Sequence, residues 1–284
     1  MPSEAGFILV HVSMVAYSKY QARAVYDALR HAQDGSIDKL ASALQAHLNA
    51  MKLINGEMET MWTRSDPNDY KIFRTFIMGI KSQPMFPEGV LYEGVCNERK
   101  NYRGESGAND SIIPTADNLF QIFERMPENP LTEILKDFRS YRPPMHTEWL
   151  SYVQDTAQRI GFRQLALRNV RTAVLMLENL DQIREFRQRH WNFTKEYILK
   201  HSNHPVATGG SPIVTWLPNQ LSTVLRIMDE TLEAIEMMKE DPEMDDHHRQ
   251  RIDAVKKRMV SQENNLEREV QLYSAKVSGR SGTA

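Results

Sequence analysis

The feature that most constrains the fold is a long run, Trp149 to Lys200, that contains no proline and only one glycine, Gly161. Proline removes a backbone donor from a helix and glycine weakens it, so a run almost free of both favours long helices. Apolar residues recur at about one helical turn, at Val174, Leu175, Leu177, Leu180, Ile183 and Phe186. We therefore expect two or more long helices in this stretch.

The helical pattern extends over most of the remaining chain. Residues 36–62 carry apolar side chains about one turn apart, and Asp66-Pro67 is typical of a helix start. The helix that follows is expected to bury an apolar face formed by Ile72, Phe73, Phe76 and Ile77. Segments rich in proline and glycine predict loops over residues 82–111 and 201–218.

These patterns predict an all-α fold, because no segment alternates apolar and polar residues over the length of a strand. We expect a single helical domain over residues 1–276. It ends in a helical hairpin over residues 217–276, because two helical patterns there are separated by Asp241-Pro242. Residues 277–284 are expected to form a disordered tail.

Composition and charge disfavour several classes of protein. The 35 Lys and Arg nearly balance the 37 Asp and Glu, whereas a general nucleic-acid binder carries a basic excess. The single cysteine, Cys96, allows no intramolecular disulfide and no multi-cysteine metal site. The apolar segment Gly6–Tyr17 is too short to span a membrane and predicts a buried helix. We expect a cytoplasmic protein that binds neither nucleic acid nor a membrane.

Among the nine histidines, His190 has the most suggestive setting. It lies late in a long helical run, with Arg187 one turn before it. A single imidazole on a helical body, with cations nearby, is an arrangement that a haem site uses. The alternative is an ordinary structural histidine, and spacing alone favours that alternative.

Five segments, in order, resemble the indoleamine 2,3-dioxygenase family and its fungal branch in particular. They are Gly89–Gly94, Arg103–Ser111, Tyr141–His146, the helix around His190, and the distinctive segment His204–Gln220, HPVATGGSPIVTWLPNQ. The likeness runs from about Gly6 to about Gln220. Family enzymes carry a smaller helical domain before the part that matches Gly6, and we expect this chain to lack it.

The resemblance implies a large helical haem-binding domain of the indoleamine/tryptophan dioxygenase type. Family members are iron enzymes that use haem b and O2 to open the indole C2–C3 bond of L-tryptophan. The product is N-formylkynurenine, in the kynurenine pathway of tryptophan catabolism. The resemblance thus predicts an oxidoreductase with a small-molecule substrate, and we expect a monomer.

On the proximal side of the haem, the resemblance implies that His190 is the ligand of the iron. Arg187 matches the family arginine beside the haem, and Asp117 matches an aspartate that pairs with that arginine. An imidazole would occupy one axial position of the iron, and the ion pair would hold the ligand helix against the haem edge.

On the distal side, the resemblance implies that Ser106 and Gly107 lie over the porphyrin and leave space for an indole ring. Arg74 matches the arginine that takes the substrate carboxylate, a target that suits a planar fork of donors. Thr208 matches the threonine that hydrogen-bonds the amino-acid end of the substrate. His11 matches a residue near the indole N–H of the substrate. Phe7 would line the same pocket.

Three hypotheses follow. The first is a haem-dependent dioxygenase that acts on L-tryptophan or a related indoleamine. The second is an N-terminally shortened, non-catalytic haem-binding or regulatory relative of that family. The third is a helical scaffold without a cofactor, whose C-terminal hairpin mediates association.

Overall fold

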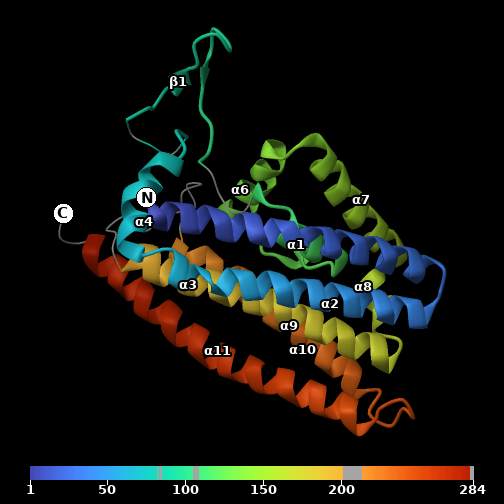
Figure 1. Ribbon diagram of the computed structural model, residues 1–284. Helices are drawn as coiled ribbons and strands as arrows, with labels where there is room; N and C mark the ends of the chain where they lie inside the picture. The colour runs from blue at the N-terminus through green and yellow to red at the C-terminus, as the bar shows by residue number, and fades with distance from the viewer. Residues whose placement is uncertain (82, 84, 105–108, 201–212, 282–284) are drawn as a thin grey trace.

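The computed structural model describes residues 1–81, 83, 85–104, 109–200 and 213–281, and most of this part of the chain is helical (Figure 1). The all-α prediction is confirmed. Its longer α-helices are α1 (Pro2–Gln33), α2 (Ile37–Glu59), α4 (Pro67–Ile77), α7 (Pro144–Ile160), α9 (Val170–Phe193), α10 (Ile213–Glu236) and α11 (Asp246–Ser281). Shorter elements are α3 (Met61–Arg64), α5 (Ile112–Leu119), η2 (Phe123–Arg125), α6 (Pro130–Phe138), η3 (Arg139–Tyr141), α8 (Phe162–Ala166) and the π-helical segment η4 (Thr194–Leu199).

Helix α9 lies at the centre of the fold. It packs against α2 on one side and against α10 and α11 on the other, while α1 lies along α2 (Figure 1). The side chain of Asn169 caps its start by accepting from the backbone N–H groups of Arg171 and Thr172. Its next turns are buried on every side, as in Val174, Leu175, Met176 and Leu177. A helix that is apolar all round belongs in a core, so the run that dominates the sequence forms the core element.

Buried polar pairs fix the neighbours of α9. On the α2 side, His47 and Asn179 are buried, and His47 Nδ1 donates to Asn179 Oδ1 at 2.6 Å. Burial is the main reason that the pKa of His47 falls to about 4, so its imidazole is neutral at pH 7. On the α11 side, the buried carboxylate of Asp181 accepts from Arg184 Nε at 2.7 Å and from Arg258 Nε at 2.8 Å.

Two predictions about buried faces are wrong. Helix α1 forms where the apolar segment 6–17 predicts a helix, but one face of it is exposed, at Ile8, Leu9, Val12 and Val15. On α4, the buried side chains are Tyr70 and Phe73, whereas Ile72 and Phe76 are exposed. A helical period shows which residues share a face, but packing decides which face is covered.

Three further differences concern the boundaries of elements. The segment 82–111 contains a short antiparallel pair of strands, β1 (Val90–Leu91) and β2 (Arg99–Lys100), on an arm that projects from the helices (Figure 1). Helix α10 begins at Ile213, before the expected boundary at 217, and α11 continues to Ser281, beyond the expected boundary at 276. Within the described ranges, no helix is both long enough and apolar enough to cross a bilayer.

Candidate functional site

His190 lies near the C-terminal end of α9, where the side chains of the helix no longer face only core. Burial, followed by the charges of His11 and Arg187, lowers the pKa of His190 to about 4. The residue is nevertheless exposed. That exposure moderates the effect of burial on the pKa. The imidazole is mainly neutral at pH 7 even at its ordinary pKa, so a lone pair is available to a metal.

Arg187 stands one turn before His190 on the same face of α9 and is buried. Its Nη2 donates to both carboxylate oxygens of Asp117, at 2.9 Å and 2.7 Å. Asp117 comes from α5, so this pair joins α5 to the His190 end of α9. By contrast, Arg189 turns toward α2, where its Nη1 donates to Asn55 Oδ1 at 2.9 Å. Of these two arginines, only Arg187 shares the side of His190.

The Arg187 guanidinium keeps two buried donors, Nε and Nη1, that contact no acceptor among the described residues. Leaving a buried donor unsatisfied costs about 1–3 kcal/mol, so such groups indicate a place for an acceptor. A haem presents one iron that needs an imidazole and carboxylates that need cationic donors. The accessible imidazole of His190 and the open donors of Arg187 therefore fit a haem.

Across from α9, helix α1 brings His11 and Phe7 to the same region. His11 contributes to the lowered pKa of His190, so the two side chains lie in the same part of the fold. His11 Nδ1 lies 2.8 Å from the carbonyl oxygen of Phe7, and because a carbonyl only accepts, Nδ1 carries the proton. The other ring nitrogen, Nε2, is then the acceptor. The Phe7 and His11 rings are in contact, with centroids 4.6 Å apart.

Arg74 lies on α4 and is half-buried. Burial lowers its pKa, and its electrostatic interaction with Tyr70 opposes that shift. The Tyr70 ring contacts Phe7, with centroids 5.5 Å apart. Arg74 is therefore joined to the His11 and His190 region through Tyr70 and Phe7. The structure does not place it in open solvent.

Two residues at this end of the fold were missed in the sequence. Arg142 is buried and its Nη2 donates to the backbone carbonyl of Asp110 at 3.1 Å. Burial raises the pKa of Asp110, while backbone N–H groups, Arg142 and His11 oppose the rise. Both lie inside segments that carry the family resemblance, yet their partnership joins positions far apart in the chain. No local pattern signals it.

The remaining candidates, Ser106, Gly107 and Thr208, lie outside the described residues. Their assignments stay predictions.

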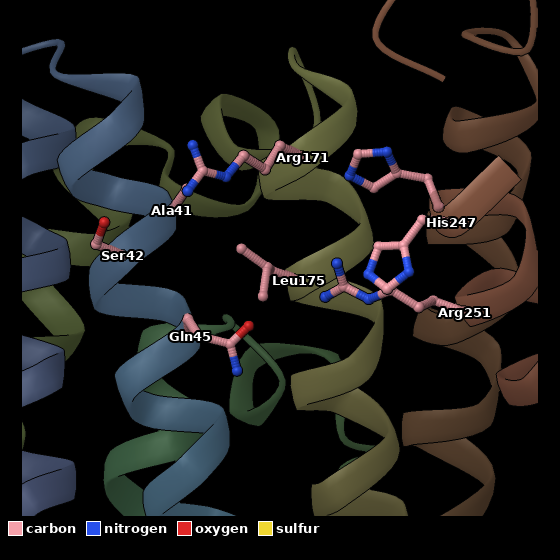
Figure 2. A pocket seen from close by; sticks show the side chains of 8 residues that line it. Ala41, Ser42, Gln45, Arg171, Leu175, His247 and Arg251 are labelled. Atoms are coloured by element: carbon pink, nitrogen blue, oxygen red, sulfur yellow. The ribbon is translucent and has the colours of Figure 1, made fainter. Parts of the chain in front are cut away.

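A concave region lies elsewhere, between α2, α9 and α11, with a volume of about 450 Å³. Figure 2 shows Arg171, Arg251 and His247 around it. Both arginines are already paired, Arg171 with Asp38 at 3.1 Å and Arg251 with Glu178 through two hydrogen bonds. Over the described ranges, no group of three His, Cys, Asp or Glu side chains could hold a bare metal ion. The His190 region is the better candidate site.

Comparison with known proteins identifies the family of the chain. The sequence model of the family described as "Indoleamine 2,3-dioxygenase" matches residues 1–241. Indoleamine 2,3-dioxygenase 1 of Rattus norvegicus is 28% identical over 203 residues, which cover 70% of this chain and 49% of that protein. Indoleamine 2,3-dioxygenase 2 of Mus musculus is 26% identical over 248 residues, which cover 81% of this chain and 58% of that protein.

Indoleamine 2,3-dioxygenase 2 of Homo sapiens is 26% identical over 250 residues, with the same coverage of 81% and 58%. The chain thus spans about half the length of the curated relatives it matches. The family model covers most of the chain, including α1, α4, α5 and α9, which carry the candidate site. The chain belongs to the indoleamine 2,3-dioxygenase family.

Proposed function

We propose that this chain is a haem-dependent dioxygenase that opens the indole C2–C3 bond of L-tryptophan with O2 to give N-formylkynurenine. The observation that carries the proposal is the accessible imidazole of His190 beside the buried open donors of Arg187. Membership of the family supports the reaction class. We also propose that the protein acts as a cytoplasmic monomer on a small-molecule substrate.

His190 would bind the iron of haem b through a neutral imidazole nitrogen. Arg187 would direct Nε and Nη1 toward a haem propionate, and Asp117 would hold the guanidinium in place from α5. When bound, the haem supplies the activation of O2, because the bond-making chemistry belongs to the cofactor. The chain's own residues position the substrate and exclude water.

On the substrate side, Arg74 would bind the carboxylate of tryptophan, since a guanidinium offers parallel donors to two oxygens. Phe7 would contact the indole ring. His11 has Nδ1–H engaged with the Phe7 carbonyl, so Nε2 would accept a hydrogen bond from the indole N–H. Ser106 and Gly107 would flank the ring over the haem, and Thr208 would bind the amino-acid end.

The test uses the full chain loaded with haem. Reduction of the protein under nitrogen, followed by addition of CO, should give the absorption spectrum of a CO-bound haem. Addition of L-tryptophan, O2 and a reductant should then produce the absorbance of N-formylkynurenine. A CO spectrum without product would favour the non-catalytic haem-binding alternative, and no stoichiometric haem at all would favour the scaffold alternative. Either result would overturn the proposal.

A further inference from the structure

Helix α11 begins after residue 241, where the match to the family model ends, yet it packs along the core helix α9 (Figure 1). Polar side chains join the two helices, and on α9 and its continuation η4 they recur every three or four residues, which places them on one face. The contacts are Arg251 with Glu178, Arg258 with Asp181, Gln262 with Arg184 and Gln188, and Glu269 with Trp191 and Lys195. The contacts of Glu269 are thus made at the end of α9 that carries His190.

The carboxylate of Glu269 accepts two hydrogen bonds there. Trp191 Nε1 donates to Glu269 Oε2 at 2.8 Å, and Lys195 Nζ donates to Glu269 Oε1. Trp191 is buried, and a buried indole N–H needs an acceptor, which Glu269 provides. The Trp191 ring also lies beside two other side chains, with Lys195 Nζ 5.6 Å and the Tyr273 ring 5.9 Å from its centroid. These contacts hold the indole in one orientation.

The orientation of Trp191 bears on His190 because the two residues are consecutive on α9. Neighbouring residues of an α-helix lie about 100° apart around its axis, so Trp191 meets α11 while His190 lies on another face. The α-helical pattern ends at Phe193 and a π-helical segment begins at Thr194. Trp191 lies before this junction and Lys195 after it, so Glu269 holds both sides of the junction next to His190.

We propose that Glu269 is a positioning residue for the iron ligand, because it holds Trp191 and Lys195 and thereby fixes the direction in which α9 presents the His190 imidazole. The proposal rests on the function proposed above, in which His190 binds the iron of haem. Glu269 acts only through α9 and η4, since both of its partners lie on the face toward α11.

Two substitutions separate the parts of this role. Glu269→Gln keeps an acceptor for the Trp191 N–H but removes the charge that pairs with Lys195. Glu269→Ala removes both contacts and leaves the buried indole N–H without its acceptor. We therefore expect Glu269→Gln to lie between the parent and Glu269→Ala. The intermediate variant gives the same comparison at a smaller amplitude, so the test does not depend on the folding of Glu269→Ala.

The experiment has one readout with haem and one without it. In the haem-loaded full chain, resonance Raman measures the iron–imidazole stretch, and transfer of haem to apomyoglobin measures its release. Hydrogen bonds to charged groups are strong enough that Glu269→Ala should speed release about tenfold, with a shifted and broader stretching band. In the haem-free chain, hydrogen exchange at the backbone amides of residues 190–195 should also rise about tenfold, because the end of α9 opens more often.

Arg251→Met is the matched control, since Arg251 also joins α11 to α9, through two hydrogen bonds to Glu178. That contact lies about 18 Å before His190 along the helix. We expect Arg251→Met to lower stability against urea but to leave the stretching band and the exchange of residues 190–195 as in the parent.

Two results would overturn the inference while the proposed function stood. One is a Glu269→Ala protein with the band and the local exchange of the parent. The other is an equal change of both readouts in Arg251→Met. If the parent took up no haem, the proposed function and this inference would both fall.

Discussion

The ion pair between Asp117 and Arg187 offers the most quantitative test of how the site is built. Both side chains are nearly inaccessible, at 7% and 6% exposure, and the closest atoms are 2.7 Å apart. Replacing Asp117 with Asn leaves the buried guanidinium of Arg187 without its counter-charge. This guanidinium already has two donors, Nε and Nη1, without an acceptor among the described residues. Removing one partner of a buried pair costs about 3–5 kcal/mol, and we expect that loss in the free energy of unfolding.

The assay is urea unfolding of four proteins without haem: the parent, Asp117→Asn, Arg187→Met and the double variant. Because each single variant strands the other charge, the double variant should be less damaged than the sum, with a coupling of about 1–3 kcal/mol. The slope of the unfolding free energy with urea should stay constant, which shows that the transition remains two-state. Haem affinity should fall in every variant.

The exposed pair between Arg171 and Asp38 is the matched control, since it also joins an arginine of α9 to an aspartate. Its atoms are 3.1 Å apart, but the side chains are 48% and 95% exposed. Such pairs contribute about 0–1 kcal/mol, so its cycle should show little coupling. Simple additivity at Asp117 and Arg187, or equal coupling in the two cycles, would refute the reasoning that burial gives the pair its energetic role.

Three further predictions concern the substrate, pH and packing. Arg74→Ala should lower kcat/KM for tryptophan, with a loss of about 2–5 kcal/mol in the binding energy of the transition state. It should not alter the binding of indole, which lacks the amino-acid end. Equal effects on tryptophan and indole would contradict the proposed pocket. His47 is unprotonated in the folded protein down to about pH 4 but takes up a proton near pH 6.5 when unfolded, so it destabilises the fold as pH falls through this window. Between pH 7.5 and pH 5 the parent should lose about 2 kcal/mol more stability than His47→Gln, measured by urea unfolding, and equal losses would contradict this. A Cβ on Gly6 would lie 1.9 Å from the backbone oxygen of Arg64, whereas one on Gly56 would meet nothing within 4 Å. Gly6→Ala should therefore lower the free energy of unfolding by about 1–3 kcal/mol. Gly56→Ala should raise it by about 1 kcal/mol. Effects of the same sign would show that α1 does not approach α3 closely.

The parts of the fold that could be predicted depend on local chain properties. The absence of proline around α9 and the proline at the start of α4 act within one or two turns, so the helices were predictable from the residues alone. The pairing of Arg187 with Asp117 was implied by the family resemblance, and the structure brings the two side chains together.

The rest depends on long-range packing. The covered face of α4 is set by Phe7 and Tyr197, which come from distant segments and meet Tyr70 only in the folded protein. The partnership of Asp110 with Arg142 also joins separate loops. The exposed face of α1 has the same composition as a buried one, so periodicity could not tell them apart. Such features follow from the three-dimensional arrangement and from no local pattern.

The central claim is that His190 binds the haem iron through its imidazole. The most direct measurement is the haem stoichiometry and Soret spectrum of purified His190→Ala, compared with the parent and with His247→Ala. His247 is an exposed histidine of the concave region between α2, α9 and α11. We expect the parent and His247→Ala to retain one haem each and His190→Ala to lose it. Imidazole added to His190→Ala should restore part of the Soret band by filling the position of the lost ring. An unchanged Soret band and CO spectrum in His190→Ala would contradict the account.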